Sequence, residues 1–249
     1  MRLMSYNILS GGQARTNGRD RLGDILAVCR RAAPDILALQ EANGIDKAEI
    51  ADRFHSLGLP YHAVALAPPY LDGERYHVAV FSRWPLSAPD VFAQVAFETA
   101  ALKVNVHSPL GLLTLVNLHL HSTSEAERLG EISGILKSLP GDSALMVTGD
   151  FNAISRFDPY PDTAGEFENR TDVTDRLAHL VDLFAARPGG PHWTHPSRCK
   201  ADHSRRINRR IDYVFADSTL ALRVQDAQVI RTDQAHRASD HFPVVVDLR

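Results

Sequence analysis

The amino-acid sequence predicts an α/β fold in which two sheets pack face to face and helices lie outside them. Three observations lead to this prediction: strand-like segments outnumber helical ones, several strands follow each other as hairpins, and the chain opens as strand, helix, strand. The 249 residues, 44% of them hydrophobic, suffice for a substantial core. We therefore expect one domain that spans residues 1–249.

The first half of the chain shows both the helical and the strand periodicity. Helices are predicted at residues 20–33, 47–57 and 124–139. Pro34 ends the first of them, and Ser122 or Ser124 caps the third. Strands are predicted at residues 2–8, 35–40, 61–66, 77–82, 100–108 and 112–119. The last two flank the sequence PLG and therefore predict a hairpin.

The second half opens with a predicted strand at residues 143–150, after which the pattern weakens. Residues 155–172 predict a loop, 174–186 a helix and 187–210 a long connection. Strands are predicted near the end of the chain at residues 211–217, 222–231 and 242–248.

Charge and composition limit the classes of function. The 27 basic and 30 acidic side chains give a net charge of -3, which excludes a strongly basic, non-specific nucleic-acid binder. No apolar stretch reaches the roughly 18 residues of a membrane span, and no signal-peptide pattern opens the sequence. Cys29 and Cys199 match neither a disulfide framework nor a zinc spacing. We expect a cytoplasmic protein without an obligate protein partner.

A set of polar residues stands where predicted strands end. Its members are Asn7, Glu41, His119, Asp150, Asn152, Asp212, Asp240 and His241. In the sequence GDFNA, Asp150 and Asn152 would point to the same side if strand geometry continued through the turn. An acid and an amide can bind a hard cation through oxygen while the amide nitrogen donates to an anion. For this segment alone, a simple turn capped by Asp150 is an equal alternative.

Seven motifs occur in order along the chain: SYNI, LQE, SRWPL, NLHLHS, GDFNA, RIDYVFA and SDHFPV. Together they resemble the endonuclease, exonuclease and phosphatase family, which includes deoxyribonuclease I, exonuclease III, neutral sphingomyelinases and inositol polyphosphate 5-phosphatases. The resemblance runs from Asn7 to His241. It implies a four-layer α/β/β/α sandwich like that of deoxyribonuclease I, with two mainly antiparallel sheets, and divalent-metal-dependent hydrolysis of a phosphoester.

The resemblance also implies a metal site for Mg²⁺ or Mn²⁺. Glu41 becomes the principal ligand with Asn7 beside it, and Asp240 lies near the metal or near His119. A carboxylate that follows a buried strand needs a compensating charge, which a divalent cation would supply; from its own segment alone, Glu41 is equally well a helix cap. Zinc at His119 and His121 is less well supported, because further ligands with matching spacing are missing and oxygen ligands favour Mg²⁺ or Mn²⁺.

The remaining polar residues take catalytic roles by the same resemblance. Asp150 orients or deprotonates the attacking water, and Asn152 contacts the phosphate or assists the metal. His119 and His241 stabilise charge or transfer a proton, since imidazole titrates near neutrality. Asp212 is expected to pair with His241 and hold its orientation.

Substrate contacts are predicted in two places. Tyr76 either contacts the phosphoester or is a packed tyrosine. The basic segment 198–210 leads into the strand of Asp212 and could follow a polyanion; alternatively its arginines pair with acids elsewhere. The arginines singled out in this segment are Arg205, Arg206, Arg209 and Arg210.

The sequence thus favours a nuclease or phosphodiesterase, with nucleic acid as one class of substrate. The alternatives are a phosphomonoesterase acting on a small or lipid phosphate and a non-catalytic relative that binds phosphate. At NLHLHS the chain resembles the deoxyribonuclease I, sphingomyelinase and phosphatase branches, because abasic-site endonucleases typically carry a tyrosine-containing segment there. His119 therefore makes an abasic-site repair role doubtful.

Overall fold

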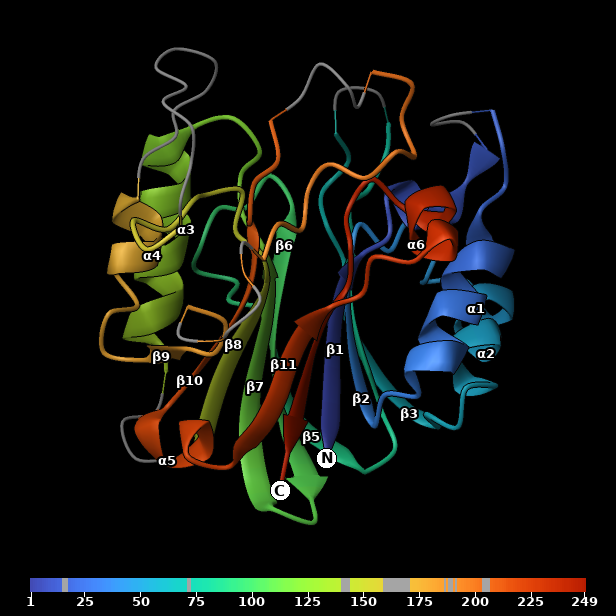
Figure 1. The fold of residues 1–249 in the computed structure, drawn as a ribbon. Coiled ribbons are helices and arrows are strands. Elements are labelled where there is room, and N and C mark those ends of the chain that lie inside the picture. Colours follow the sequence, from blue (N-terminus) through green and yellow to red (C-terminus); the bar gives the residue numbers. More distant parts are fainter. Residues whose placement is uncertain are drawn as a thin grey trace.

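The computed structural model describes residues 1–14, 18–70, 73–139, 144–158, 171–185, 187, 190, 192–202 and 207–249. Across them, two sheets of six strands pack against each other, with α1 (Leu22–Ala32) and α2 (Ala48–His55) outside one sheet. Helices α3 (Glu125–Lys137) and α4 (Asp172–Asp175) lie outside the other sheet (Figure 1). The four-layer α/β/β/α sandwich predicted from the sequence is confirmed.

The first sheet contains the N-terminal strand and has the order β11-β12-β1-β2-β4-β3. Its strands are β1 (Arg2–Asn7), β2 (Ile36–Gln40), β3 (Tyr61–Ala65), β4 (Val78–Ser82), β11 (Val224–Val229) and β12 (Val244–Leu248). Strands β1 and β2 are parallel, because α1 returns the chain to the start of the sheet, and the other pairs are antiparallel.

The second sheet has the order β5-β6-β7-β8-β10-β9. Its strands are β5 (Leu86–Asp90), β6 (Ala100–Ser108), β7 (Gly111–His119), β8 (Ala144–Asp150), β9 (Val181–Asp182) and β10 (Asp212–Ala216). Strands β6 and β7 form the predicted hairpin, whereas β7 and β8 are parallel and joined through α3. The hydroxyl of Ser124 caps α3 by accepting a hydrogen bond from the Glu127 amide at 3.3 Å, which decides between the two predicted caps.

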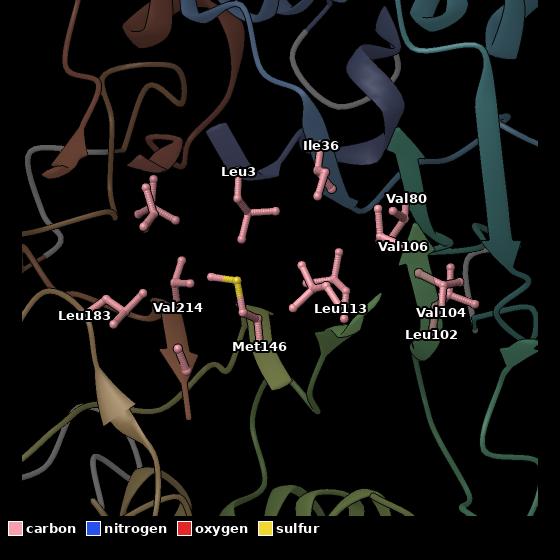
Figure 2. Close-up of a cluster of buried hydrophobic side chains, with 14 of the residues drawn as sticks. Leu3, Ile36, Val80, Leu102, Val104, Val106, Leu113, Met146, Leu183 and Val214 are labelled. Carbon is pink, nitrogen blue, oxygen red and sulfur yellow. The ribbon is translucent and has the colours of Figure 1, made fainter. Parts of the chain in front are cut away.

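Apolar side chains from both sheets fill the space between them. Figure 2 shows part of this cluster, in which Leu3 and Ile36 face Leu113, Met146 and Val214. A polar pair fixes the register between the sheets, because Gln40 Nε2 donates to Asn117 Oδ1 at 2.6 Å and the Asn117 amide nitrogen donates to backbone carbonyls of β2 and β4. This contact joins β2 to β7 close to the polar strand ends, because Gln40 directly precedes Glu41 and Asn117 lies two residues before His119.

One glycine allows β7 and β8 to approach closely at the end where the polar residues gather. Gly149 has a φ of 134°, and a Cβ atom there would lie 1.9 Å from the Leu118 carbonyl oxygen. The strand register therefore places Asp150 directly opposite His119.

The predicted helix at 174–186 is wrong. Helix α4 ends at Asp175, turns follow, and β9 pairs with Phe215 and Ala216 of β10. The reason is tertiary: Leu177 packs in the cluster beneath α3, whereas Leu183 and Phe184 belong to the core between the sheets. A continuous helix would keep these side chains on one side of the sheet.

The sequence did not predict three short elements: β5, α5 (Ser218–Ala221) and α6 (Asp233–Ala238). Both short helices are set by their caps, since Asp217 and Thr232 accept hydrogen bonds from the first-turn amides. Among the helices of the described residues, none combines the length and the apolar character that crossing a membrane requires.

Candidate active site

The polar residues predicted at strand ends meet at one end of the sandwich. Strands β1, β2, β7 and β8 end there, and β10 and β12 begin there, away from the N and C labels of Figure 1. A cavity of about 350 Å³ opens between these ends. Of the predicted site residues, those that line it are Glu41, Tyr76, His119, Asp150, Asn152, Arg209, Asp240 and His241.

Glu41 and Asn7 occupy adjacent strand ends of the first sheet. Glu41 has a φ of 50°, and its carboxylate accepts hydrogen bonds from the Ser10 amide at 2.9 Å and from Asn7 Nδ2 at 3.2 Å. Asn7 Nδ2 also donates to Asp150 Oδ2 at 2.9 Å, while Asn7 Oδ1 accepts from the Leu9 amide. Asn7 is thus a neutral bridge between two carboxylates, and its amide oxygen points away from both.

Asp150 and Asn152 both reach the cavity, but not through continued strand geometry. Asn152 has a φ of 48°, because the chain turns after β8. The Asn152 backbone amide donates to Asp150 Oδ1 at 2.9 Å, and its side-chain nitrogen donates to the Leu120 carbonyl at 2.9 Å. These contacts hold both side chains in place. The backbone forms the turn that was the alternative interpretation, and both side chains nevertheless line the cavity.

Two histidines converge on the same carboxylate oxygen. Nε2 of His119 and Nε2 of His241 each lie 3.6 Å from Asp150 Oδ2. Behind His241, the Nδ1 atom is hydrogen-bonded to Asp212 Oδ2 at 2.9 Å, so the structure forms the expected pair. Burial alone would lower the pKa of the His241 ring, but Asp212 and Asp150, with a smaller contribution from Asp240, raise it to about 10.

Asp240 lies on the other side of His241, where it pairs with basic side chains, and its predicted role as a metal ligand stays a prediction. Its Oδ2 atom is 2.6 Å from Lys200 Nζ and 3.9 Å from His195 Nε2, so its ion-pair partners are these residues and not His119. Burial would raise the pKa of this carboxyl, but His241, Lys200 and His195 together hold it well below the usual range.

Sequence reasoning missed His195 as a site residue and treated Lys200 only as part of a basic segment. Both line the cavity, and the rings of His195 and His241 have centroids 4.8 Å apart. His195 is placed by its backbone, which pairs with Arg209 just before β10. The one available signal was a histidine in the connection that leads to the Asp212 motif, since no strand pattern surrounds it.

The predicted substrate contacts divide into different outcomes. Arg210 as a substrate contact is wrong: its side chain is 1% exposed, and its guanidinium donates to Asp158 at 2.9 Å and to both oxygens of Asp182 at 2.8 and 2.7 Å. Its charge is therefore used inside the protein. Arg209 lines the cavity, whereas Arg205 and Arg206 lie outside the described residues.

Tyr76 lines the cavity together with Tyr70, and their rings meet nearly edge to face with centroids 5.5 Å apart. This arrangement combines the two interpretations of Tyr76, because a tyrosine packed on a neighbour also offers a surface to a ligand.

The donor set fits a hard divalent cation. Glu41 and Asp150 share the neutral amide of Asn7, so two carboxylates face one cavity and a cation would offset their charge. In the described part of the chain, two groups of three side chains also bring their ligand atoms within 4.8 Å of one another. They are Asp150, Asp212 and His241, and His195, Asp240 and His241.

Comparison with known proteins assigns the class. The chain belongs to the endonuclease/exonuclease/phosphatase family, whose model matches residues 4–241. The family and the site together define a phosphoester hydrolase. No curated protein sequence matches the chain significantly.

Solved structures confirm the fold. An endonuclease/exonuclease/phosphatase from Beutenbergia cavernae is 25% identical and superimposes with a TM-score of 0.77 over all of this chain and 71% of that one. Two further structures each match all of this chain over 99% of their own length. One is an AP endonuclease from Archaeoglobus fulgidus, with 17% identity and a TM-score of 0.76. The other is a 3′ phosphatase from Neisseria bound to product DNA hairpin, with 17% identity and a TM-score of 0.72.

Proposed function

We propose that this chain is a Mg²⁺- or Mn²⁺-dependent phosphodiesterase or nuclease in which a water attacks the phosphorus atom in line with the leaving group. One observation supports the proposal most directly. Inside one cavity, the imidazoles of His119 and His241 both lie close to the Asp150 carboxylate, and Asn7 links this carboxylate to that of Glu41 by hydrogen bonds. A base, positive charge and a cation site thus face the same space.

Asp150 holds the water. Asn7 and the Asn152 amide occupy both of its oxygens and fix the carboxylate in place, and this orientation leaves it able to accept a water proton in the cavity. Asn152, anchored on the Leu120 carbonyl, presents its side chain to the phosphate.

His241 supplies fixed positive charge for the phosphoryl oxygens, because Asp212 keeps it protonated at neutral pH. His119 reaches the same space from β7 and contacts a phosphoryl or leaving-group oxygen. Glu41 would hold the metal, which when bound polarises the phosphoryl oxygen and stabilises the leaving group.

A diester is the preferred substrate class. An endonuclease, which cleaves a phosphodiester, is among the related folds, and the cavity offers Arg209, Tyr70 and Tyr76 to groups beyond the phosphate. Because the Arg210 charge is paired inside the protein, the basic segment offers less positive charge to a polyanionic substrate. A phosphomonoesterase is the second candidate: a related fold is a 3′ phosphatase, and both Lys200 and Arg209 line the cavity, where added positive charge suits a dianion.

A substrate panel tests the proposal. Plasmid, single-stranded DNA, RNA, bis-p-nitrophenyl phosphate and phosphomonoesters are each incubated with Mg²⁺, Mn²⁺ or EDTA. We expect metal-dependent cleavage of a diester that EDTA abolishes. Hydrolysis of monoesters alone would favour the second candidate, and turnover that persists in EDTA would contradict both.

Mn²⁺ calorimetry on Glu41→Ala complements the panel, because the variant removes the main anionic ligand. We expect at least about tenfold weaker Mn²⁺ binding together with lost turnover. Unchanged Mn²⁺ affinity would remove Glu41 from the metal site.

A further inference from the structure

Lys200 reaches the active-site cavity from a segment that is fastened to the residues around Asp240. The Ser197 amide donates to the Asp240 carbonyl at 2.6 Å, and the Ser197 hydroxyl donates to the Ser239 carbonyl. The Cys199 amide then donates back to Ser197 Oγ at 3.0 Å. These contacts hold the segment against the turn before β12, so the position of the Lys200 ammonium follows from the fold.

The ammonium lies between a buried carboxylate and the cavity. Lys200 Nζ is 2.6 Å from Asp240 Oδ2, and the Asp240 side chain is only 5% exposed, whereas that of Lys200 is 30% exposed. Both residues line the cavity. A lysine ammonium has three donors and no acceptor, so it can keep one N–H on Asp240 and direct another towards a ligand oxygen.

We propose that Lys200 is the second cation of this active site: it neutralises Asp240 and contacts a phosphoryl oxygen of the substrate, and Glu41 holds the single divalent ion. The inference rests on the proposed function. It adds Lys200 as a contact of the substrate and one divalent ion per chain as the metal stoichiometry. It also revises the predicted role of Asp240, which becomes the partner of a lysine in place of a metal ligand.

Electrostatics opposes a second metal ion at Asp240. The carboxylate could form an ion cluster with His195 and His241, but a divalent cation there would sit within a few ångströms of the Lys200 ammonium. One carboxylate cannot neutralise both cations, and repulsion between like charges is strong where water is scarce. Among the residues that the structure describes, the donors to the Glu41 carboxylate are the neutral groups of Ser10 and Asn7, and no ion pair of Glu41 with a cation occurs.

A phosphate group gains from the same arrangement. It would meet the metal on the Glu41 side and Lys200 on the Asp240 side, with His241 between Asp150 and Asp212. Two positive groups that contact one phosphate restrict its orientation and also offset its negative charge. Lys200 therefore acts through direct contact with the substrate.

Calorimetry with MnCl₂ on the metal-free protein tests the stoichiometry without any substrate. We expect one Mn²⁺ per chain in the wild type, and an affinity in Asp240→Asn that stays within about threefold of wild type because Asp240 is not a ligand. Two Mn²⁺ per chain, or a tenfold loss of affinity in Asp240→Asn, would overturn the proposal.

Binding of inorganic phosphate to the Mn²⁺-loaded protein tests the contact. Lys200→Met should weaken phosphate binding at least about tenfold, and Lys200→Arg, which keeps the charge, should stay within about threefold. Lys137→Met, the same change at the exposed end of α3, is the matched control and should bind as wild type. Wild-type phosphate affinity in a folded Lys200→Met protein, checked by circular dichroism, would overturn the proposal.

These readouts separate the inference from the proposed function. If no phosphoester is hydrolysed, the proposed function fails, but Mn²⁺ stoichiometry and phosphate affinity still decide the role of Lys200. If Lys200→Met does not fold, Lys200→Gln, which also removes the charge, takes its place: wild-type phosphate affinity in that variant, or a second Mn²⁺ per wild-type chain, would overturn the proposal.

Discussion

His119 and His241 approach Asp150 from the two sheets at the same distance, yet their surroundings differ. Each Nε2 atom lies 3.6 Å from Asp150 Oδ2. Behind His241 stands Asp212, hydrogen-bonded to Nδ1 at 2.9 Å. Behind His119, Nδ1 is buried and has no hydrogen-bond partner within the described residues. Distance to the shared carboxylate therefore does not determine what each ring does.

The second nitrogen makes the difference. An acid behind His241 holds the orientation of the ring and its charge, so this ring is a fixed cation. The His119 ring is held mainly through its strand, where Thr99 Oγ1 donates to its carbonyl and Gly149 admits β8 beside it. We infer that His241 stabilises charge and that His119 provides a weaker, adjustable contact.

The largest effect separates the two rings directly. His241→Gln should lower kcat/KM for the diester about a thousandfold, because it removes a preorganised positive charge. His119→Gln should cost about a hundredfold. Steady-state kinetics of both variants, with circular dichroism as the folding control, make the measurement. A larger loss in His119→Gln than in His241→Gln would reverse the assignment.

Asp212 should act only through His241. Asp212→Asn is expected to lower kcat about a hundredfold in the wild type but less than about threefold in the His241→Gln background, because residues that work as a unit are not additive. A double-mutant cycle tests this. Independent losses that multiply in the double variant would mean that Asp212 has a separate role.

The charge of His241 can be followed by titration of the metal-free protein. Its pKa is raised from 6.5 to about 10, so its contribution to folding stability is complete below about pH 6.5 and is lost as the pH rises through about 10. Ring nitrogen NMR should therefore show a protonated His241 at pH 8, and Asp212→Asn should lower the pKa. A wild-type midpoint near 6.5 would contradict the fixed-cation role.

The smallest effect concerns the support on the His119 side. Glu131 Oε2 accepts the His121 amide at 2.8 Å, and burial raises the pKa of Glu131 to about 7, with backbone hydrogen bonds acting in the opposite direction. Since the folded protein holds this proton up to a higher pH than the unfolded chain, stability should fall between about pH 4.5 and 7.

Glu131→Gln removes this ionisation, so it should unfold with a flatter pH dependence and be more stable than wild type at pH 8, by up to about 3 kcal/mol. Urea denaturation at pH 5 and pH 8 measures the difference. Turnover should change less than threefold. An unchanged pH dependence would show that Glu131 ionises normally.

The sequence predicted the parts of the fold and site that depend on strand periodicity. Asn7, Glu41 and Asp150 were found because a polar residue at the end of an apolar strand is a local signal. The helix at 174–186 failed because its apolar residues serve two different cores, which only the packed sheets reveal.

Long-range placement could not be derived from sequence. Arg209 and Arg210 are adjacent and identical in type, yet one faces the cavity and the other is buried against Asp158 and Asp182, because successive residues of extended chain point in opposite directions. Lys200 lies in an irregular connection, and its position follows from contacts with the turn before β12.

We propose that Asp150, shared by both histidines, activates water for phosphoester hydrolysis when a divalent metal is bound. The most direct test of this role measures Mn²⁺ binding and single-turnover diester cleavage in the same preparation of Asp150→Asn. We expect Mn²⁺ affinity within about tenfold of wild type and a cleavage rate lower by about a hundredfold or more. A rate within threefold of wild type, with the metal bound and the fold intact, would contradict it.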